Sequence, residues 1–360
     1  MRYLDEFRDP RLAEAMLKRI VAECDRPLRF MEVCGTHTVA IFRSGIRQLL
    51  PPQISLLSGP GCPVCVTSQH DIDYAIELAG QPGVILATYG DMMKVAGTRS
   101  SLMQERAAGR DVRVVYSAAD AVQLAADNPG RQVIFLGVGF ETTAPTAALS
   151  VLEAAERGLR NYRMFSVHKV IGPPLRALLN SGEVQLHGFI LPGHVSTIIG
   201  TSPYQFLVSE YSMPGVITGF EPLDILQSVH MLITQVANGR PSIEIQYRRA
   251  VRTEGNTAAQ AIMEKVFAPV DAVWRGLGLI PQSGLRLREE YAEFDAERAY
   301  AVDVSYSREP KGCRCGEVLR GVVSPKQCPL FADTCTPEHA IGPCMVSSEG
   351  TCAAYYRYGR

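Results

Sequence analysis

The stretch Arg29-Phe-Met-Glu-Val33, followed at once by Cys34-Gly-Thr-His37, decides the fold of this chain. Its first half is a short, largely apolar run, as in a buried strand, and its second half places a cysteine and a histidine where a helix would begin. In open parallel sheets, ligands bind outside the carboxyl ends of the strands. A cysteine directly after a strand therefore predicts a binding site at the edge of a sheet.

The same strand-then-helix pattern continues to about residue 250. Short β-branched or apolar runs alternate with longer amphipathic ones, which is typical of βαβ units around parallel sheets. A helix is expected between Pro10 and Cys24, because Leu12, Met16 and Ile20 form an apolar series with a spacing of four residues. Strands are expected at residues 29–33, 54–58, 84–88, 112–116, 132–137, 163–167, 188–191, 215–218 and 243–247.

The predicted fold class is α/β, with two lobes of parallel sheets built from Rossmann-like βαβ units and a C-terminal cysteine-rich iron–sulfur domain. The expected strands are too many for one small nucleotide-binding unit, and the regular alternation fades near residue 250. After residue 311 the chain is rich in Cys, Gly and Pro. We therefore expect a first lobe with a thiol site at residues 1–130, a second lobe at 131–250 and an iron–sulfur domain at 251–360.

Composition argues against several classes of function. The 360 residues are 46% hydrophobic, enough for a large core, and 36 Lys and Arg stand against 37 Asp and Glu. This balance provides no overall field for binding nucleic acid. The N-terminus lacks the apolar segment of a signal peptide, and no uncharged apolar run approaches the roughly 20 residues of a membrane span. We therefore expect a cytoplasmic protein that binds neither nucleic acid nor a membrane.

The cysteines fall into two groups. In a chain without a secretory signal, ten cysteines indicate metal ligands or redox thiols rather than a disulfide framework. Cys34, Cys62 and Cys65 form the first group, whereas Cys24, on the apolar face of its helix, is expected in the core. The second group lies near the C-terminus and comprises Cys313, Cys315, Cys328, Cys335, Cys344 and Cys352. Two separate sites are predicted.

Cys62 and Cys65 have the spacing that lets two sulfurs form a disulfide or bind one metal ion. Residues 67–79 are expected to form a helix, whose dipole would favour a thiolate. Half of a structural zinc site is the alternative, although no second CxxC pair lies nearby. Cys34 could also be held as a thiolate by backbone N–H groups, or simply be buried. Three thiolates together suit a soft metal such as iron.

His37 and Glu141 each allow two interpretations. His37 could donate to a ligand at the thiol site, or be satisfied by the backbone at the start of its helix; the same alternatives apply to His194. Glu141 precedes two threonines at the expected start of a helix. Its carboxylate could bind or orient a partner, or merely cap the helix.

The C-terminal spacing, C-x1-C-x12-C-x6-C-x8-C-x7-C, is irregular for zinc ribbons, which repeat CxxC, but suits a cubane cluster held by four thiolates. Prolines and glycines around these cysteines favour tight loops rather than helices. A cluster uses four of the six cysteines from Cys313 to Cys352 and leaves two without this role. The spacing alone does not select the four ligands.

Four blocks of the sequence resemble the hydrogenase maturation factor HypD family. They are residues 31–38, 59–65 and 139–145, and the cysteine-rich end through residues 342–346. The resemblance implies three α/β-type domains with a [4Fe–4S] cluster in the third. It also implies a role in assembling the iron–dicyanide–carbonyl moiety, Fe(CN)2CO, of nickel–iron hydrogenases.

The resemblance further implies partners and residue roles. In the family, a small scaffold protein, HypC, forms a complex with HypD, and HypE supplies cyanide. By this resemblance Cys34 holds the iron together with a thiolate of the scaffold. Cys62 and Cys65 then cycle between dithiol and disulfide or act as further ligands, and the cluster passes electrons to them. Such a protein is a redox-active metallocofactor assembly factor rather than a conventional metabolic enzyme.

Two other functions fit the same cysteines. One is an iron–sulfur thiol–disulfide reductase in which Cys62 and Cys65 reduce a protein disulfide and no iron fragment is carried. The other is a zinc-stabilised interaction scaffold, which would be colourless, whereas a [4Fe–4S] protein is brown.

Overall fold

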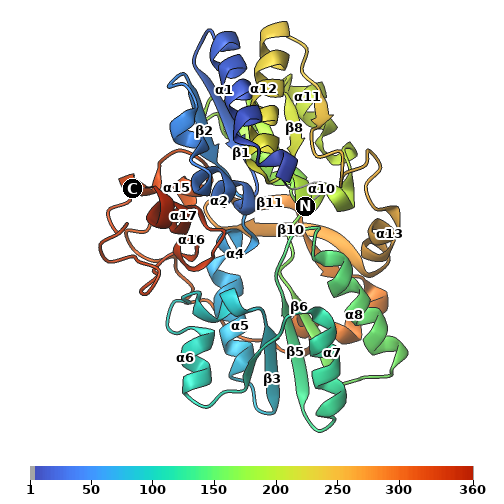
Figure 1. Cartoon of the computed structure of the whole chain (residues 1–360). Coiled ribbons are helices and arrows are strands. Elements are labelled where there is room, and N and C mark those ends of the chain that lie inside the picture. The colour runs from blue at the N-terminus through green and yellow to red at the C-terminus, as the bar shows by residue number, and fades with distance from the viewer. Residues whose placement is uncertain (1–4, 360) are drawn as a thin grey trace.

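The computed structural model describes residues 5–359 and confirms an α/β fold with two parallel sheets (Figure 1). The first sheet has the strand order β2-β1-β7-β8-β9, and the second has the order β4-β3-β5-β6. The first comprises β1 (Leu28–Glu32), β2 (Ile54–Ser58), β7 (Gly188–Pro192), β8 (Gly215–Thr218) and β9 (Ile243–Ile245). The second comprises β3 (Val84–Thr88), β4 (Val112–Val114), β5 (Gln132–Gly137) and β6 (Tyr162–Ser166). The nine expected strands thus exist: four have the expected bounds, and the other five differ at their ends by one or two residues.

Helices cover both faces of the first sheet, as burial of a parallel sheet requires. Alternate strand residues point to opposite faces, so Phe30 packs with one set of helices and Met31 with the other. The first set is α1 (Pro10–Glu23), α2 (Gly35–Arg43), α3 (Ile46–Leu49) and α12 (Pro222–Asn238). The second set is α9 (Gly172–Ser181), α10 (Gly193–Ile199) and α11 (Gln205–Tyr211). We call this sheet with its helices the first lobe.

The second lobe is built in the same way around the second sheet. All five residues of β3 are buried, and Ile85 and Leu86 point into separate cores on the two faces. One face carries α7 (Ala118–Asp127), α8 (Ala144–Glu156) and α13 (Thr257–Val266). The other carries α5 (Gln69–Ala79) and α6 (Leu102–Ala107).

The expected helix between Pro10 and Cys24 is confirmed as α1. Asp9 caps its N-terminus by accepting a hydrogen bond from the backbone N–H of Arg11 at 2.8 Å, and Pro10 occupies the first turn. Ile20 and Cys24 are buried in the core shared with α12, and Ala13, Met16 and Leu17 pack partly against it, but Leu12 is 49% exposed because it lies outside this face of α1. The buried stripe is therefore shorter than the periodicity predicted.

Along its nine parallel strands the chain crosses between the lobes twice, so the sheets do not follow the expected boundary near residue 130. After β2, residues 59–68 lead to the second lobe, and after β6, residues 167–171 lead back to the first. Each of the ranges 1–130 and 131–250 therefore supplies strands to both sheets. The division of the chain into three folding units, namely these two ranges and residues 251–360, stays a prediction. The periodicity identifies strands but not their neighbours, and β1 pairs with the distant β7.

An antiparallel hairpin, absent from the expected elements, lies across both crossings. It consists of β10 (Phe267–Trp274) and β11 (Gly278–Leu287) and spans the region between the lobes in Figure 1. Trp274 pairs with Thr67 in the first crossing, and Gly284 pairs with Lys169 in the second. The hairpin therefore holds both connections in place. Pro269 weakens the strand pattern of β10 in the sequence.

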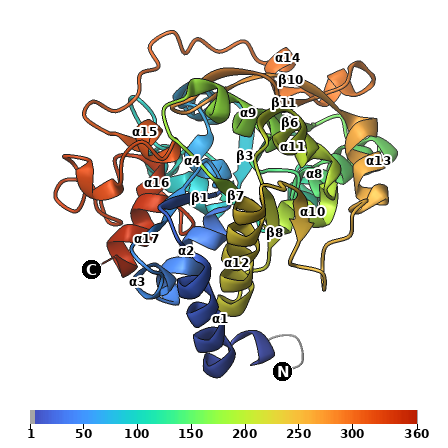
Figure 2. The same ribbon diagram turned by 90° about the horizontal axis from the view of Figure 1, so that it is seen from above.

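The cysteine-rich end forms a separate layer of loops and short helices beside the first lobe (Figure 2). Tyr355 stacks edge-on against Phe42 of α2 and accepts a hydrogen bond from Arg47. The helices of this end are α15 (Cys315–Leu319), α16 (Pro343–Val346) and α17 (Thr351–Tyr358). The remaining helical turns are α4 (Pro63–Val66), α14 (Ala296–Ala299), η1 (Asp5–Phe7), η2 (Gly90–Lys94), η3 (Ser202–Tyr204), η4 (Glu289–Phe294) and η5 (Pro325–Gln327).

Gly61 joins the two cysteine loops of the first lobe. Its carbonyl accepts a hydrogen bond from the backbone N–H of Gly35 at 3.0 Å. A Cβ at this position would overlap the backbone of Val33 and Cys34. Only glycine therefore lets the loop after β2 lie against the loop after β1.

Replacing Gly61 by alanine should lower the free energy of unfolding by about 1–3 kcal/mol, because the added methyl group must displace buried backbone. Urea unfolding measures this change. Gly130→Ala is the matched control, since nothing surrounds a Cβ at Gly130. Equal stability of the two variants would contradict the close packing described here.

Candidate functional site

A cleft of about 530 Å³ lies where the carboxyl ends of strands from both lobes meet. The first lobe contributes Cys34 after β1 and His194 after β7, and the second contributes Tyr89 and Asp91 after β3 and Thr143 after β5. The third contributor is the cysteine-rich end, through Ser347, Ser348 and Glu349. A cleft is therefore present at the carboxyl ends of strands, where the sequence predicted a binding site, but Glu141 does not line it.

Cys34 is 8% exposed and lies at the N-terminus of α2. Burial and the nearby Glu349 carboxylate raise the pKa of the thiol to about 11, although backbone N–H groups of His37 and Thr36 act against this rise. The helix start was expected to hold a thiolate, but burial outweighs it. Cys34 is thus a neutral thiol, and it becomes a thiolate only when a metal ion or another cation takes the place of its proton.

Cys62 and Cys65 are buried side by side, with their sulfur atoms 2.6 Å apart. The expected helix at residues 67–79 is observed as α5, which begins two residues later at Gln69, but a separate short helix, α4, capped by Cys62, precedes it. Burial, followed by the neighbouring Cys62, raises the pKa of Cys65 well above its ordinary value. Cys65, too, is therefore a neutral thiol, and its sulfur is close enough to that of Cys62 to bond to it.

The three N-terminal cysteines do not form a ready metal site. Within residues 5–359, no three Cys, His, Asp or Glu side chains are placed to hold one metal ion. Cys34 faces the cleft, whereas Cys62 and Cys65 pack in the core beneath it with Cys315 and Cys344. The pair therefore lies between the cleft and the C-terminal cysteines Cys315 and Cys344.

His37 is held by the backbone. Its Nε2–H group donates to the carbonyl oxygens of Thr218 and Gly219 at 3.1 and 3.0 Å. Burial lowers the pKa of the ring to about 4, so the imidazole is neutral. Nδ1 is buried without a partner. Phe220 is stacked between His37 and His194, with ring centroids 4.6 and 3.9 Å away, and this stack fixes the ring of His194 in the cleft wall.

Glu141 fastens the second lobe to the returning crossing. One carboxylate oxygen accepts a hydrogen bond from the backbone N–H of Ile171 at 2.9 Å, and the other is buried without a partner. Burial raises the pKa of this carboxyl group to about 7. Thr143, not Glu141, occupies the N-cap position of the helix that follows, α8, which has no side-chain capping hydrogen bond. The alternative that Glu141 merely caps a helix is therefore wrong.

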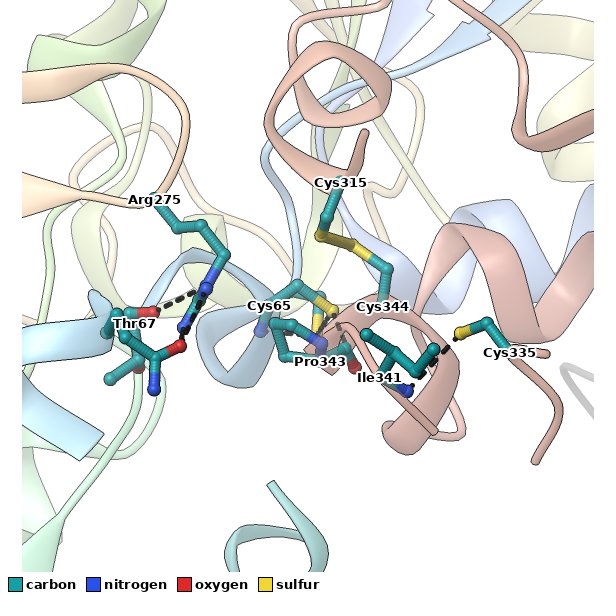
Figure 3. The surroundings of a disulfide bond; sticks show 10 residues. Cys65, Thr67, Arg275, Cys315, Cys335, Ile341, Pro343 and Cys344 are labelled. Carbon is teal, nitrogen blue, oxygen red and sulfur yellow. Dashed lines mark hydrogen bonds between the residues drawn. A yellow bond between two sulfur atoms is a disulfide. The ribbon is translucent and has the colours of Figure 1, made fainter. Parts of the chain in front are cut away.

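All six C-terminal cysteines line one small cavity, with Leu330, Phe331 and Met345 as apolar neighbours. Cys315 and Cys344 are joined by a disulfide (Figure 3). The four others carry free thiols: Cys313, Cys328, Cys335 and Cys352. Burial raises the pKa of Cys352, and Cys313, Cys335 and Cys328 raise it further, which shows that these four thiols lie close to one another.

Glu349 was not singled out from the sequence. Its carboxylate accepts a hydrogen bond from the Thr36 hydroxyl at 2.6 Å, two residues from Cys34. Ser347 donates to Asp91 of the second lobe at 3.2 Å. The cysteine-rich end therefore contacts both walls of the cleft. No sequence signal marks this contact, because it depends on how the chain end folds back.

Comparison with known proteins gives the family of this chain. The HypD family model, described as "Hydrogenase formation hypA family", matches residues 11–359. The hydrogenase expression/formation protein HupD of Azotobacter chroococcum is 49% identical over 369 residues, which covers 100% of this chain and 97% of the relative. The hydrogenase maturation factor HypD of Escherichia coli is 46% identical over 366 residues, covering 99% and 98%.

In the described part of the chain, no helix is long and apolar enough to cross a membrane. The sheets, the cleft with its cysteines and the full-length matches agree with one another. The chain belongs to the HypD family of hydrogenase maturation factors.

Proposed function

We propose that this protein assembles or carries the Fe(CN)2CO fragment of nickel–iron hydrogenases in the cleft at Cys34. The observation that carries the proposal is the position of Cys62 and Cys65. They lie buried between the cleft and the six-cysteine cavity, and the Cys65 thiol is 3.8 Å from the carbonyl oxygen of Pro343, next to Cys344. A redox-active pair in this position connects an iron-binding thiol to an electron source.

Cys34 is the proposed iron-binding residue. A buried neutral thiol loses its proton when a metal ion takes its place, so iron binding and deprotonation occur together. Thiolates bind iron strongly because both are soft. The cleft leaves room beside Cys34 for a second thiolate, which we assign to a HypC-type scaffold protein, and for a HypE-type protein to deliver cyanide.

The residues of the C-terminal cavity fit a [4Fe–4S] cluster. The disulfide removes Cys315 and Cys344 from the possible ligands, so the ligand set becomes Cys313, Cys328, Cys335 and Cys352. These thiols surround a cavity and do not converge on one point. A cluster of several irons suits this spread better than a single zinc ion, whose four sulfurs must lie about 2.3 Å from one centre.

The cluster ligands and the Cys62–Cys65 pair have different roles in the proposed electron transfer. When bound, the cluster would supply electrons one at a time. Two electrons and two protons convert a Cys62–Cys65 disulfide to the dithiol, breaking the S–S bond. The dithiol can then pass two electrons to the iron fragment, releasing two protons as the disulfide forms again. Because the pair is buried, solvent thiols do not compete for this exchange.

An iron–sulfur thiol–disulfide reductase is the rival function. It would use the same buried pair but would need access for a protein disulfide. Cys62 and Cys65 are 4% and 0% exposed, which disfavours direct attack on a protein partner.

Anaerobic purification with the HypC-type scaffold should give a complex whose infrared spectrum shows cyanide and carbonyl bands. Cys34→Ala should abolish these bands, because the iron loses its ligand. Cys24→Ala is the matched control, since Cys24 is a buried cysteine of the α1 core. A complex with iron and sulfide for one cluster but no such bands would indicate the reductase.

Cys328→Ser should lose the brown chromophore and most iron and sulfide, because it removes a cluster ligand. The double variant Cys315→Ser and Cys344→Ser should keep them. Absorption spectra and iron analysis of anaerobically purified protein measure both. The ligand assignment is wrong if the double variant loses the cluster while Cys328→Ser retains it.

A further inference from the structure

Arg275, at the tip of the β10–β11 hairpin, is a buried cation without a carboxylate partner. Its side chain is among the largest that are fully buried, and the residue is 2% exposed. Nε donates to the carbonyl oxygen of Thr67 at 3.1 Å, and both terminal nitrogens donate to the same oxygen of Gln69 at 3.2 Å. Every hydrogen-bond acceptor of this guanidinium within residues 5–359 is neutral.

A buried charge of this kind is costly unless an anion lies nearby. Two carboxylates are in electrostatic range of Arg275, but neither forms a salt bridge with it. Glu309 is exposed, so water screens its charge. Asp71 already pairs with Lys169 at 3.5 Å and with His70. The positive charge of Arg275 is therefore not balanced by the carboxylates.

The remaining groups that can become negative near Arg275 are cysteine sulfurs. Cys65 and Cys313 are both within electrostatic range of the guanidinium. In Figure 3, Arg275 extends from the hairpin toward Thr67, with Cys65 between it and the Cys315–Cys344 disulfide. Arg275 thus lies beside both sulfur sites.

We propose that Arg275 balances the negative charge of the thiolate–iron centre at the C-terminal cysteines and of the adjacent Cys62–Cys65 pair. This inference rests on the proposed function, because the anion that Arg275 balances is the proposed cluster. A [4Fe–4S] centre with four thiolates is an anion, and it gains a further negative charge on reduction. A fixed cation beside it makes reduction easier.

The hairpin holds this cation in place. The backbone N–H of Arg275 donates to the carbonyl oxygen of Val66 at 2.9 Å, directly after Cys65. On the other side, Gly276 packs so closely against Gly316 that a Cβ on either glycine would meet the other's backbone. The position of Arg275 is therefore fixed relative to Cys65 and to Cys315.

The test is the midpoint potential of the cluster, measured by redox titration with electron paramagnetic resonance. Arg275→Met should shift the reduction equilibrium about tenfold toward the oxidised form, a fall of about 59 mV for one electron. Arg275→Lys should stay near the wild-type potential, because it keeps the charge. Arg286→Met is the matched control, since Arg286 lies on the same hairpin but pairs with Glu297.

Two results would overturn the inference. One is an unchanged potential in Arg275→Met. The other is an equal shift in Arg275→Lys and Arg275→Met, which would assign the effect to lost hydrogen bonds rather than to charge. Circular dichroism confirms that each variant is folded.

A second measurement needs no cluster and so separates this inference from the proposed cofactor. Cluster-free protein is reduced, freed of reductant and treated with iodoacetamide at one fixed pH. Mass spectrometry then gives the ratio of modified Cys313 to modified Cys328, a half-buried cysteine without Arg275 beside it. Arg275→Met should lower this ratio at least about threefold, because the thiolate of Cys313 loses its cation. An unchanged ratio would contradict the role of Arg275 even if the wild-type protein binds no cluster.

Discussion

The close packing of Gly61 against the backbone of Val33 and Cys34 is the constraint on which the site depends. Two strand ends of the first sheet carry their cysteines into different environments, Cys34 into the cleft and Cys62 into the core. The missing side chain at Gly61 lets the two loops touch, so these environments are separated by little more than one layer of backbone. An open cleft and a buried redox pair can therefore act on one another without sharing a surface.

Burial determines the chemistry of these thiols more than helix position does. Cys34 and Cys62 both lie at helix starts, yet the pKa values of Cys34 and of Cys65, the partner of Cys62, are raised because little water reaches them. A neutral thiol is less reactive toward oxidants and metal ions than a thiolate. Arg275 is the opposite case, a charge kept inside where neutral side chains dominate. Under the proposed function, negative charge would form in this region only when iron is bound.

Much of the fold could be predicted from local pattern. The β-branched runs identified all nine parallel strands, and the four-residue spacing in residues 10–24 identified α1. The pairing of these strands could not be predicted, because β1 and β7 carry no mark of each other and the chain crosses between the lobes twice. The hairpin was missed because Pro269 and the exposed residues of β10 weaken its pattern. Glu349 and Arg275 were missed because their roles come from distant contacts.

By itself, the sequence determined which residues carry the chemistry: the CxxC pair, Cys34 after its strand and the cysteine-rich end. Residue type and short-range spacing are enough for this, since sulfur chemistry and turn geometry are local properties. Only the tertiary structure decided how these groups are connected. It placed Cys62 and Cys65 between the cleft and the C-terminal cavity, joined Cys315 to Cys344, and buried Arg275 beside them. Burial and charge balance depend on the whole surroundings of a side chain, and these come from segments far apart in the chain.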